Sequence, residues 1–174
     1  MRFKIRRLTL KDLPQLLSLF NTSLEEDFEE FQPTVAKVYR RMFNKKYFVA
    51  FMKKRKNCVL GIFHKGKLVG LFMMYGHSGG VLEYIWLIVD KDFRRKGIAS
   101  SLITKAEEWA LRHKFHHTYL YTMNKRLVEF YKSLGFEHVG WLRNFFFGVG
   151  EHLMQKILRE EPFEEIFEKY LKKK

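Results

Sequence analysis

Hydrophobic and polar residues recur along this chain with periods that divide it into strands and helices. Arg2–Arg7 alternates charged with apolar residues, which predicts a strand. Apolar residues then recur at helical spacing after Thr9, which stands three residues before Asp12 as in a capping box. Thr34 begins a second helical segment, which we expect to reach about Lys45. Two helices are therefore expected before the main strands.

The middle of the chain has the pattern of a sheet. Two β-rich runs, Cys58–Phe63 and Leu68–Tyr75, lie on either side of a short glycine-containing connection, which predicts a hairpin. Val81–Val89 is apolar on both of its alternating faces, so we expect a central strand that is covered on both sides. A helix from about residue 97 to 114 and a strand from Thr118 to Thr122 follow. This strand, helix, strand order predicts parallel pairing.

The last part of the chain is expected to close the sheet. A short helix from Lys125 to Leu134 ends at Gly135, and residues 136–147 and 152–158 have the pattern of two strands. Pro162 begins a final amphipathic helix. No linker or repeat interrupts the sequence, so we expect one domain over residues 1–174. Its fold class is α/β (α+β), a mixed, twisted sheet of about seven strands flanked by about four helices, plus the C-terminal helix.

Composition predicts a packed core, a cellular compartment and a basic surface. With 47% apolar residues, among them 18 Phe, the chain is expected to pack a core. Cys58 is the only cysteine, so no internal disulfide can form and a cytoplasmic location is expected. No apolar run approaches the roughly 20 residues of a membrane span. The net charge of +14 attracts anions such as nucleic acids, acidic membranes or phosphorylated cofactors, without choosing among them.

Residues 89–99 carry the most informative chemistry, because they lead from the central strand through a basic turn into a helix. A helix N-terminus presents unpaired backbone N–H groups and a positive dipole end, so an anion such as pyrophosphate is stabilised there. Gly97 has no Cβ to obstruct a ligand near the backbone, and Arg94, Arg95 and Lys96 add positive charge. From these residues alone, the segment is either a phosphate-binding turn or an ordinary basic connection.

Two spacings resemble those of a known family. Arg94-x-x-Gly97-x-Ala99 resembles the acetyl-coenzyme A signature of the GNAT superfamily of N-acetyltransferases. Asn124-x-x-Leu127-x-x-x-Tyr131-x-x-x-Gly135-Phe136 resembles that family's later motif, in the same order and at a similar separation. The dinucleotide fingerprint Gly-x-Gly-x-x-Gly is absent from the turn, and the chain has no Walker-type loop. The resemblance covers about Val59 to Leu158 and implies transfer of an acetyl group from acetyl-CoA, as cosubstrate, to a primary amine by direct attack in a ternary complex.

The resemblance also implies which residues bind the cosubstrate. Backbone groups of the strand before the turn would hold the pantetheine, and an N–H there would polarise the thioester carbonyl. Asn124 would anchor the cosubstrate, or would simply be the N-cap of the helix that follows it. The full set expected to bind acetyl-CoA is Leu87, Ile88, Val89, Arg94, Arg95, Lys96, Gly97, Ile98, Ala99, Ser100, Asn124 and Tyr131.

Two residues are candidates for proton transfer. Only a neutral amine attacks a thioester, so a base is needed, and Glu83 is the single acid on the apolar central strand. It is either that base or a carboxylate at a solvated strand end. The resemblance assigns Tyr131 as the acid that protonates the departing thiolate. By spacing alone, Tyr131 shares a helical stripe with Leu127, Phe130 and Leu134 and would be a core residue.

The acceptor is the least determined part of the prediction. Acidic residues cluster beside aromatic ones at positions 25–31, which include Glu25, Glu26, Asp27, Glu29 and Glu30, with Phe28 and Phe31. This cluster indicates either a site for a cationic acceptor or a solvated loop. The acceptor is expected to be a small amine or polyamine, a lysine side chain or a peptide N-terminus. Members of the family that acetylate N-termini usually carry a glutamate on the strand before the Asn, where this chain has Tyr119–Met123.

Two alternatives stay open beside the enzyme. One is a non-catalytic basic module that binds RNA or regulates a partner on the same fold, and the other is a homodimer formed through the terminal helix, which is compatible with catalysis. The histidines show no spacing typical of a metal site, so no metal is expected.

Overall fold

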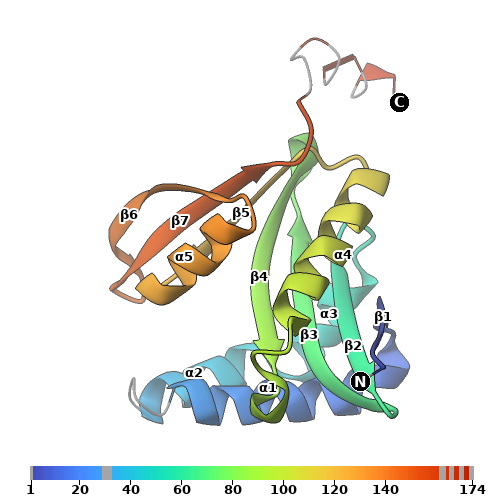
Figure 1. The fold of residues 1–174 in the computed structure, drawn as a ribbon, viewed down its shortest axis with the longest axis vertical. Coiled ribbons are helices and arrows are strands. Elements are labelled where there is room, and N and C mark those ends of the chain that lie inside the picture. Colours follow the sequence, from blue (N-terminus) through green and yellow to red (C-terminus); the bar gives the residue numbers. More distant parts are fainter. Residues whose placement is uncertain (1, 29–32, 161–163, 165–166, 169–170, 173–174) are drawn as a thin grey trace. The chain divides into compact units, whose positions relative to one another are not determined.

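The computed structural model describes residues 2–28, 33–160, 164, 167–168 and 171–172 (Figure 1). The expected C-terminal helix lies largely outside these residues, as do Pro162, Phe163, Ile166 and Tyr170. The strands are β1 (Lys4–Arg7), β2 (Cys58–His64), β3 (Lys67–Gly76), β4 (Val81–Val89), β5 (His117–Thr122), β6 (Glu137–Phe146) and β7 (Val149–Ile157). They form a seven-stranded mixed sheet in the order β1-β2-β3-β4-β5-β7-β6, which confirms the predicted fold class.

Five α-helices accompany the strands in the described part of the chain: α1 (Leu13–Phe28), α2 (Pro33–Met42), α3 (Lys45–Lys53), α4 (Ile98–Arg112) and α5 (Lys125–Ser133). The chain groups into two compact units, one made of residues 1–75 and 85–106, the other of residues 76–84 and 107–174. Both β4 and α4 contribute residues to each unit. That residues 1–174 act as one domain stays a prediction.

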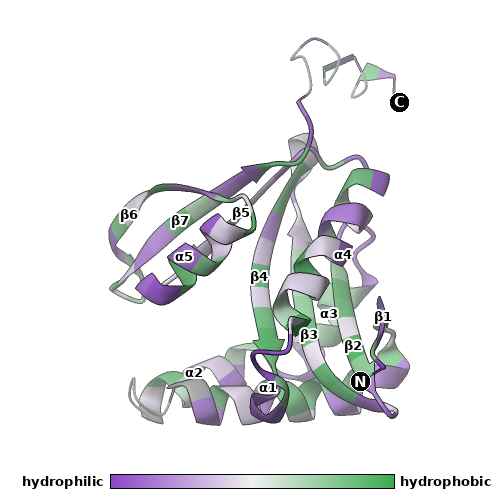
Figure 2. Cartoon of the chain, in the orientation of Figure 1, coloured by the Kyte–Doolittle hydropathy of each residue, from purple (hydrophilic) through white to green (hydrophobic). Residues whose placement is uncertain are grey.

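In the first unit, β1, β2 and β3 form an antiparallel ladder that carries the main core. The expected hairpin joins β2 to β3 through Lys65 and Gly66, both of which have positive φ angles, of 48° and 82°. Apolar residues dominate β2 and β3, as Figure 2 shows. Helices α1, α2 and α3 pack on one face of this ladder, where Phe20 and Phe48 are fully buried. The helices are therefore held by apolar packing.

Trp86 on β4 organises the aromatic part of that core. Its ring lies 5.1 Å from Phe20, 5.6 Å from Tyr39 and 5.3 Å from Phe43, each in an edge-to-face arrangement. Ile85 packs against the same cluster as Trp86 although the two are neighbours in sequence. Regular strand alternation would send them to opposite faces, so β4 departs from it here.

The first half of α4 packs on the opposite face of the same ladder. Gly70 of β3 permits this close approach, because a Cβ there would lie 3.1 Å from the carbonyl oxygen of Ile88 and 3.2 Å from the side chain of Ile98. Figure 1 shows α4 in front of the strands. The start of α4 is thereby fixed against the end of β4.

In the second unit, the start of β4 pairs with β5 in parallel, as the strand, helix, strand order predicted. Val81–Tyr84 face His117–Leu120, and β5 then pairs antiparallel with β7, which pairs antiparallel with β6. Beside this ladder, the ring of Phe136 lies 5.5 Å from Tyr131 of α5 and 6.0 Å from Tyr84 of β4.

Three sequence expectations need correction. The second helix ends at Met42 instead of Lys45, and a separate helix, α3, follows it. Asn44 begins α3 as its N-cap by accepting a hydrogen bond from the backbone N–H of Tyr47 at 3.1 Å. Strand β7 begins at Val149, earlier than expected. The buried face of α5 is made by Val128 and Tyr131, whereas Leu127 is 41% exposed.

No helix within the described residues is both long enough and apolar enough to cross a membrane.

Candidate active site

The turn between β4 and α4 has the form of an anion site. Arg95 and Gly97 adopt positive φ angles, of 58° and 73°, and α4 begins at Ile98. The first helical hydrogen bond runs from the N–H of Ser101 to the carbonyl oxygen of Gly97, at 3.0 Å. The backbone N–H groups of residues 98–100 precede that bond and have no partner within the helix. Residues 95–100 are thus neither a continuous helix nor a buried strand.

Phe93 braces the turn from within. Its ring lies 6.4 Å from Phe3 and 5.6 Å from His64, and the ammonium group of Lys96 lies 5.0 Å above it. Lys96 also donates to the carbonyl oxygen of Asp92 at 2.6 Å. Phe3 and His64 therefore hold the turn from outside and Lys96 from within, while Lys96 itself stays exposed.

The space at Gly97 refines the sequence argument. A Cβ built there would meet no protein atom within 4 Å, so packing does not demand a glycine. The positive φ angle favours a glycine, and the space beside the backbone stays open to a ligand. Arg94 and Arg95 are exposed at the same turn, and Arg94 Nε donates to the carbonyl oxygen of Val89 at 3.0 Å. Strand residues 87–89 and turn residues 94–100, predicted as cosubstrate ligands, all lie in the first unit.

Asn124 belongs to the second unit and is the N-cap of α5. Its Oδ1 accepts from the backbone N–H of Arg126 at 2.9 Å, and its own N–H donates to Thr122 Oγ1 at 3.3 Å. This confirms the N-cap role. Its exposed side-chain N–H₂ group keeps the capacity to donate to a ligand.

Glu83 stands in a three-membered hydrogen-bond network within the second unit. Its Oε2 lies 3.0 Å from His77 Nε2 and accepts from the hydroxyl of Tyr119 at 3.2 Å. The Tyr119 hydroxyl is also 3.0 Å from His77 Nε2, and the two rings stack with their centres 5.9 Å apart. The Glu83 side chain is 26% exposed, so it is neither a freely solvated strand end nor a sealed core acid.

Tyr131 lies on the other face of the same ladder. Tyr84 follows Glu83 along β4 and therefore points to the opposite face. Tyr84 is buried beside Tyr131 and Phe136. Burial raises the pKa of Tyr131 well above its usual value, so its phenol keeps its proton at neutral pH.

Comparison with known proteins identifies the family. Residues 14–136 match the model of the Acetyltransferase (GNAT) family. The chain belongs to the GNAT acetyltransferase family.

Several curated relatives and solved structures are similar to this chain. An uncharacterized N-acetyltransferase of Methanocaldococcus jannaschii is 31% identical over 140 residues, covering 68% of this chain and 62% of its own length. The N-alpha-acetyltransferase MAK3 of Arabidopsis thaliana is 29% identical over 155 residues, covering 86% and 74%. The chain thus spans less than two thirds of the first of these relatives. A crystal structure of the PaiA N-acetyltransferase of Thermoplasma acidophilum, in complex with coenzyme A, shares the fold with a TM-score of 0.77, 19% identity and coverage of 90% of this chain and 99% of that one.

Beyond its family motifs, this GNAT chain has polar residues that sequence reasoning missed. His77, Tyr119, Tyr121 and Glu151 share the Glu83 region. Tyr119 is paired with Glu83 across β4 and β5, and Tyr121 is paired with Leu153 across β5 and β7. Residues two apart on one strand lie on the same face of the sheet, so Tyr119, Tyr121 and Glu151 share the face of Glu83. Burial raises the pKa of Tyr121, and electrostatic interactions with Glu83 and Glu151 raise it further. Burial also raises the pKa of Glu151.

Only the register between β4 and β5 could have identified Tyr119 as a neighbour of Glu83. Placing Val81 opposite His117 brings Tyr119 opposite Glu83, but the sequence alone gave only two parallel strands without a register. His77 lies before the turn at Gly79 and Gly80, and no residue pattern indicated that this turn would return it to Glu83. Long-range pairing was therefore the missing information.

The acidic cluster near α1 is partly engaged inside the first unit. Glu25 forms an ion pair with Arg40, and Glu26 pairs with Lys91 at 2.9 Å beside the groove between α1 and the loop after β4. Glu29, Glu30 and Phe31 lie outside the described residues, as do the side chains of Asp27 and Phe28. The two describable carboxylates are thus already paired with cations of the chain.

Cys58 is buried, and burial raises its pKa to about 12, which fits the interpretation as a small apolar residue. Among the residues that the structure describes, no three His, Cys, Asp or Glu side chains gather in a way that could hold a metal ion.

Proposed function

We propose that this chain is an N-acetyltransferase that transfers the acetyl group of acetyl-CoA to a primary amine by direct attack. One observation carries the proposal: a braced turn with positive φ angles delivers the open N-terminus of α4, with three exposed cations, directly after β4. Such a helix N-terminus stabilises a pyrophosphate through backbone N–H groups and the helix dipole. Membership of the GNAT family supports assigning this turn to coenzyme A.

The residues of the first unit bind the cosubstrate in this proposal. Arg94, Arg95 and Lys96 neutralise the phosphates, and the N–H groups of residues 98–100 donate to them. Backbone groups of Leu87, Ile88 and Val89 hydrogen-bond the pantetheine, and an N–H among them polarises the thioester carbonyl. In the second unit, Asn124 contributes its side-chain N–H₂ group.

Glu83 and Tyr131 move the protons. Glu83 accepts a proton from the acceptor ammonium group, which leaves a nitrogen lone pair free to attack the carbonyl carbon. The new C–N bond forms, the C–S bond breaks, and Tyr131 donates its phenolic proton to the sulfur of coenzyme A. The nitrogen loses its second proton to water as the amide forms, Tyr131 regains a proton from water and Glu83 releases its proton to water, so one proton is released per turnover. Burial raises the pKa of Tyr131, so its phenol is protonated when the thiolate appears.

Glu83 and Tyr131 lie on opposite faces of the β4–β5 ladder, so the proposed base and the proposed acid are separate groups with different surroundings. The reverse assignment is disfavoured, because the more deeply buried Tyr131 resists ionisation and is a poor base at neutral pH.

The acceptor is a primary amine of one of three kinds: a small amine or polyamine, a lysine side chain or a peptide N-terminus. Aromatic side chains surround the Glu83 face, with the ring of Tyr121 lying 5.6 Å from Tyr119 and 4.8 Å from Phe145. Aromatic rings beside a carboxylate favour a cationic group. The Arabidopsis relative is an N-alpha-acetyltransferase by name, which keeps a peptide N-terminus among the candidates.

The proposal is tested by binding and turnover. Calorimetry is expected to show coenzyme A binding, and labelled acetyl-CoA is expected to mark one class in a panel of polyamines, peptides and small amines. With the best acceptor, Glu83→Gln should lower kcat by about 10²- to 10⁴-fold, the usual contribution of a general base, while coenzyme A binding is unchanged.

Glu129→Gln is the matched control, because Glu129 is an exposed carboxylate that forms an ion pair with Lys132. This variant should turn over like the unaltered protein. Absence of coenzyme A binding would overturn the whole proposal. Normal turnover of Glu83→Gln would remove Glu83 as the base while leaving the transferase activity standing.

A further inference from the structure

A stretch of 52 residues in the middle of the chain contains no acidic residue. Residues 31–82 lack Asp and Glu altogether but include eleven Lys and Arg. The chain as a whole has 33 basic and 19 acidic residues, so such a gap separates the charges strongly. The net charge of +14 is therefore unevenly distributed along the sequence.

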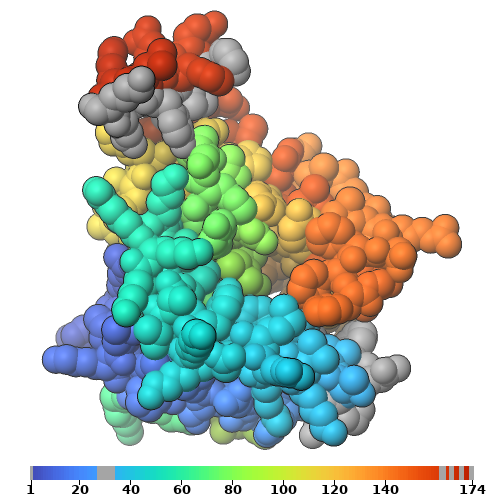
Figure 3. Space-filling model, turned by 180° about the vertical axis from the view of Figure 1, so that it is seen from behind, coloured from blue at the N-terminus to red at the C-terminus, as the bar shows by residue number. Residues whose placement is uncertain are grey.

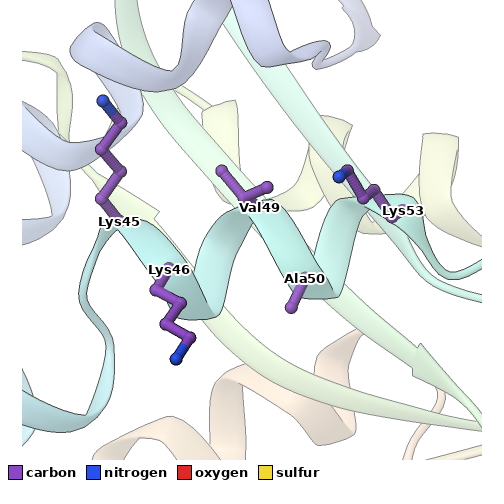
Figure 4. A pocket seen from close by; sticks show the side chains of 5 residues that line it. All are labelled: Lys45, Lys46, Val49, Ala50 and Lys53. Atoms are coloured by element: carbon purple, nitrogen blue, oxygen red, sulfur yellow. The ribbon is translucent and has the colours of Figure 1, made fainter.

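Six of these cations fall on α3 and the loop that follows it. We call them the α3 cationic surface: Lys45, Lys46, Lys53, Lys54, Arg55 and Lys56. All six are exposed. Figure 4 shows Lys45 and Lys53 toward the two ends of α3, with Val49 and Ala50 between them beside a shallow depression. In Figure 3 the teal part of the chain, which contains α3 and this loop, lies at the molecular surface.

The core packing of α3 explains why its cations point outward. Phe48 and Phe51 are buried in the main core and fix the opposite side of the helix. Within the described residues, none of the six cations forms an ion pair, and Lys54 has a cation–π contact with Tyr75 at 5.6 Å. Other cations of this unit do pair with carboxylates, among them Arg6, Arg40, Lys67 and Lys91.

We propose that the α3 cationic surface binds the phosphate backbone of a single nucleic-acid strand. An unpaired array of exposed Lys and Arg is electrostatically complementary to a polyphosphate chain, and release of counterions from that chain favours binding. Lys46 and Lys53 are seven residues apart, about 10 Å along the helix axis. That distance corresponds to about three stacked nucleotides at about 3.4 Å each, so one strand can contact both.

An anionic membrane is the less favoured partner. A helix that binds a bilayer surface exposes large apolar side chains beside its cations and inserts them among the lipids. The apolar side of α3 is buried in the core instead, and no residue of α3 is among the exposed large hydrophobic residues of the described chain. The surface offers charge without an apolar wedge.

The test measures anisotropy of a fluorescein-labelled 30-nucleotide single-stranded RNA, with coenzyme A present to occupy the turn at residues 94–100. We expect binding whose affinity falls with salt, with a slope of log K against log salt near −3 for about four phosphate contacts. Lys46→Glu/Lys53→Glu/Lys56→Glu should weaken binding at least about tenfold and flatten this slope. The same three positions changed to Gln should weaken it less.

A matched variant separates the surface from total charge. Lys4→Glu/Lys11→Glu/Lys114→Glu changes three exposed lysines elsewhere and has the same net charge as the Glu variant of the α3 cationic surface. It should bind RNA nearly as well as the unaltered protein. Circular dichroism checks that each variant is folded, and the Gln variant replaces the Glu variant if that one unfolds. Equal losses in the two Glu variants would overturn the proposal, as would flotation with phosphatidylserine vesicles in the absence of RNA binding. Acetyl transfer plays no part in this readout.

Discussion

His77 gives the Glu83 carboxylate a defined orientation. The imidazole and the Tyr119 hydroxyl both reach Oε2 of Glu83, and each also contacts the other, so the carboxylate is held from two directions. A base that is held in place needs less reorganisation when the amine arrives. His77 is exposed enough to pass a proton onward to water, since 37% of its side chain is accessible.

Replacing His77 should therefore affect turnover more than binding. We expect His77→Leu to lower kcat by about tenfold while KM for acetyl-CoA is unchanged, because the variant loosens the base without touching the turn at residues 94–100. His77→Gln keeps a side-chain N–H that can donate to Glu83 and should recover part of the rate. Steady-state kinetics with the best acceptor measure both.

Two comparisons keep this expectation specific. Tyr119→Phe preserves the ring but removes the hydroxyl, so it should reduce kcat less than His77→Leu does. His138→Gln, on β6, should have no effect on kcat. If His77→Leu and His138→Gln behaved alike, the positioning role would be refuted.

Residues of the candidate site were predictable from sequence where one local segment defines them. Asn124 is an example, since an N-cap is a local requirement. Gly97 was expected for its missing Cβ, whereas the structure adds a positive φ angle at that position. His77 and Tyr119 were not predictable, because their contacts with Glu83 depend on a register between strands that are distant in sequence. Local chemistry leaves a local signature, and tertiary pairing does not.

At the scale of elements, Asp12 joins the first strand to the first helix. Its carboxylate accepts from both terminal nitrogens of Arg6, at 2.7 and 2.6 Å, and from the backbone N–H of Thr9 at 2.8 Å. The predicted pairing of Thr9 with Asp12 is present, and Arg6 of β1 adds an ion pair to it. The hydrogen bonds from Arg6, followed by those from Thr9, hold the pKa of Asp12 well below its ordinary value of 3.8.

Asp12→Asn should lower the free energy of unfolding by about 1 kcal/mol at pH 7, a modest value because the Arg6 side chain is 39% exposed. A group whose folded-state pKa is depressed stabilises the fold above its unfolded-state pKa and loses that contribution as pH falls toward the folded-state value. The difference between Asp12→Asn and the unaltered protein should thus be complete above about pH 5 and shrink below pH 4. Urea unfolding at several pH values measures it.

Glu160→Gln provides the control for this series. Glu160 is exposed, so its substitution should leave the unfolding free energy nearly unchanged at every pH. An Asp12→Asn deficit that stayed constant down to pH 2 would show that the loss comes from packing and not from the carboxylate charge.

Elements with a strong period were predicted, and those defined by a cap or a break were not. The hairpin of β2 and β3 and the order β4, α4, β5 followed directly from the pattern of apolar residues. The division of the second helical segment into α2 and α3 was missed, because Met42 and Phe43 continue the apolar period up to Asn44, where the chain changes direction. The N-cap at Asn44 begins a new helix although the apolar pattern is continuous.

At the scale of the whole molecule, the order of the strands in the sheet could not be predicted from the sequence. Two closing strands were expected after α5, but β7 and not β6 lies beside β5. Both strands carry similar alternating patterns, so the choice depends on cross-strand contacts that a single sequence does not reveal. The uneven distribution of charge, in contrast, is a property of the sequence itself, since residues 31–82 contain no Asp or Glu.

That charge should make stability depend on salt. A net charge of +14 repels itself in the compact state, and salt screens this repulsion, so the midpoint of thermal unfolding should rise by about 2–4 °C, or about 1 kcal/mol, between 20 and 300 mM NaCl. Each Lys→Glu change lowers the charge by two, so Lys46→Glu/Lys53→Glu/Lys56→Glu carries +8 and should show a smaller rise. Lys4→Glu/Lys11→Glu/Lys114→Glu has the same net charge, but it leaves the α3 cationic surface intact and should keep more of the salt effect. Identical salt responses of the two variants would mean that total charge governs stability, because local repulsion on α3 should separate them.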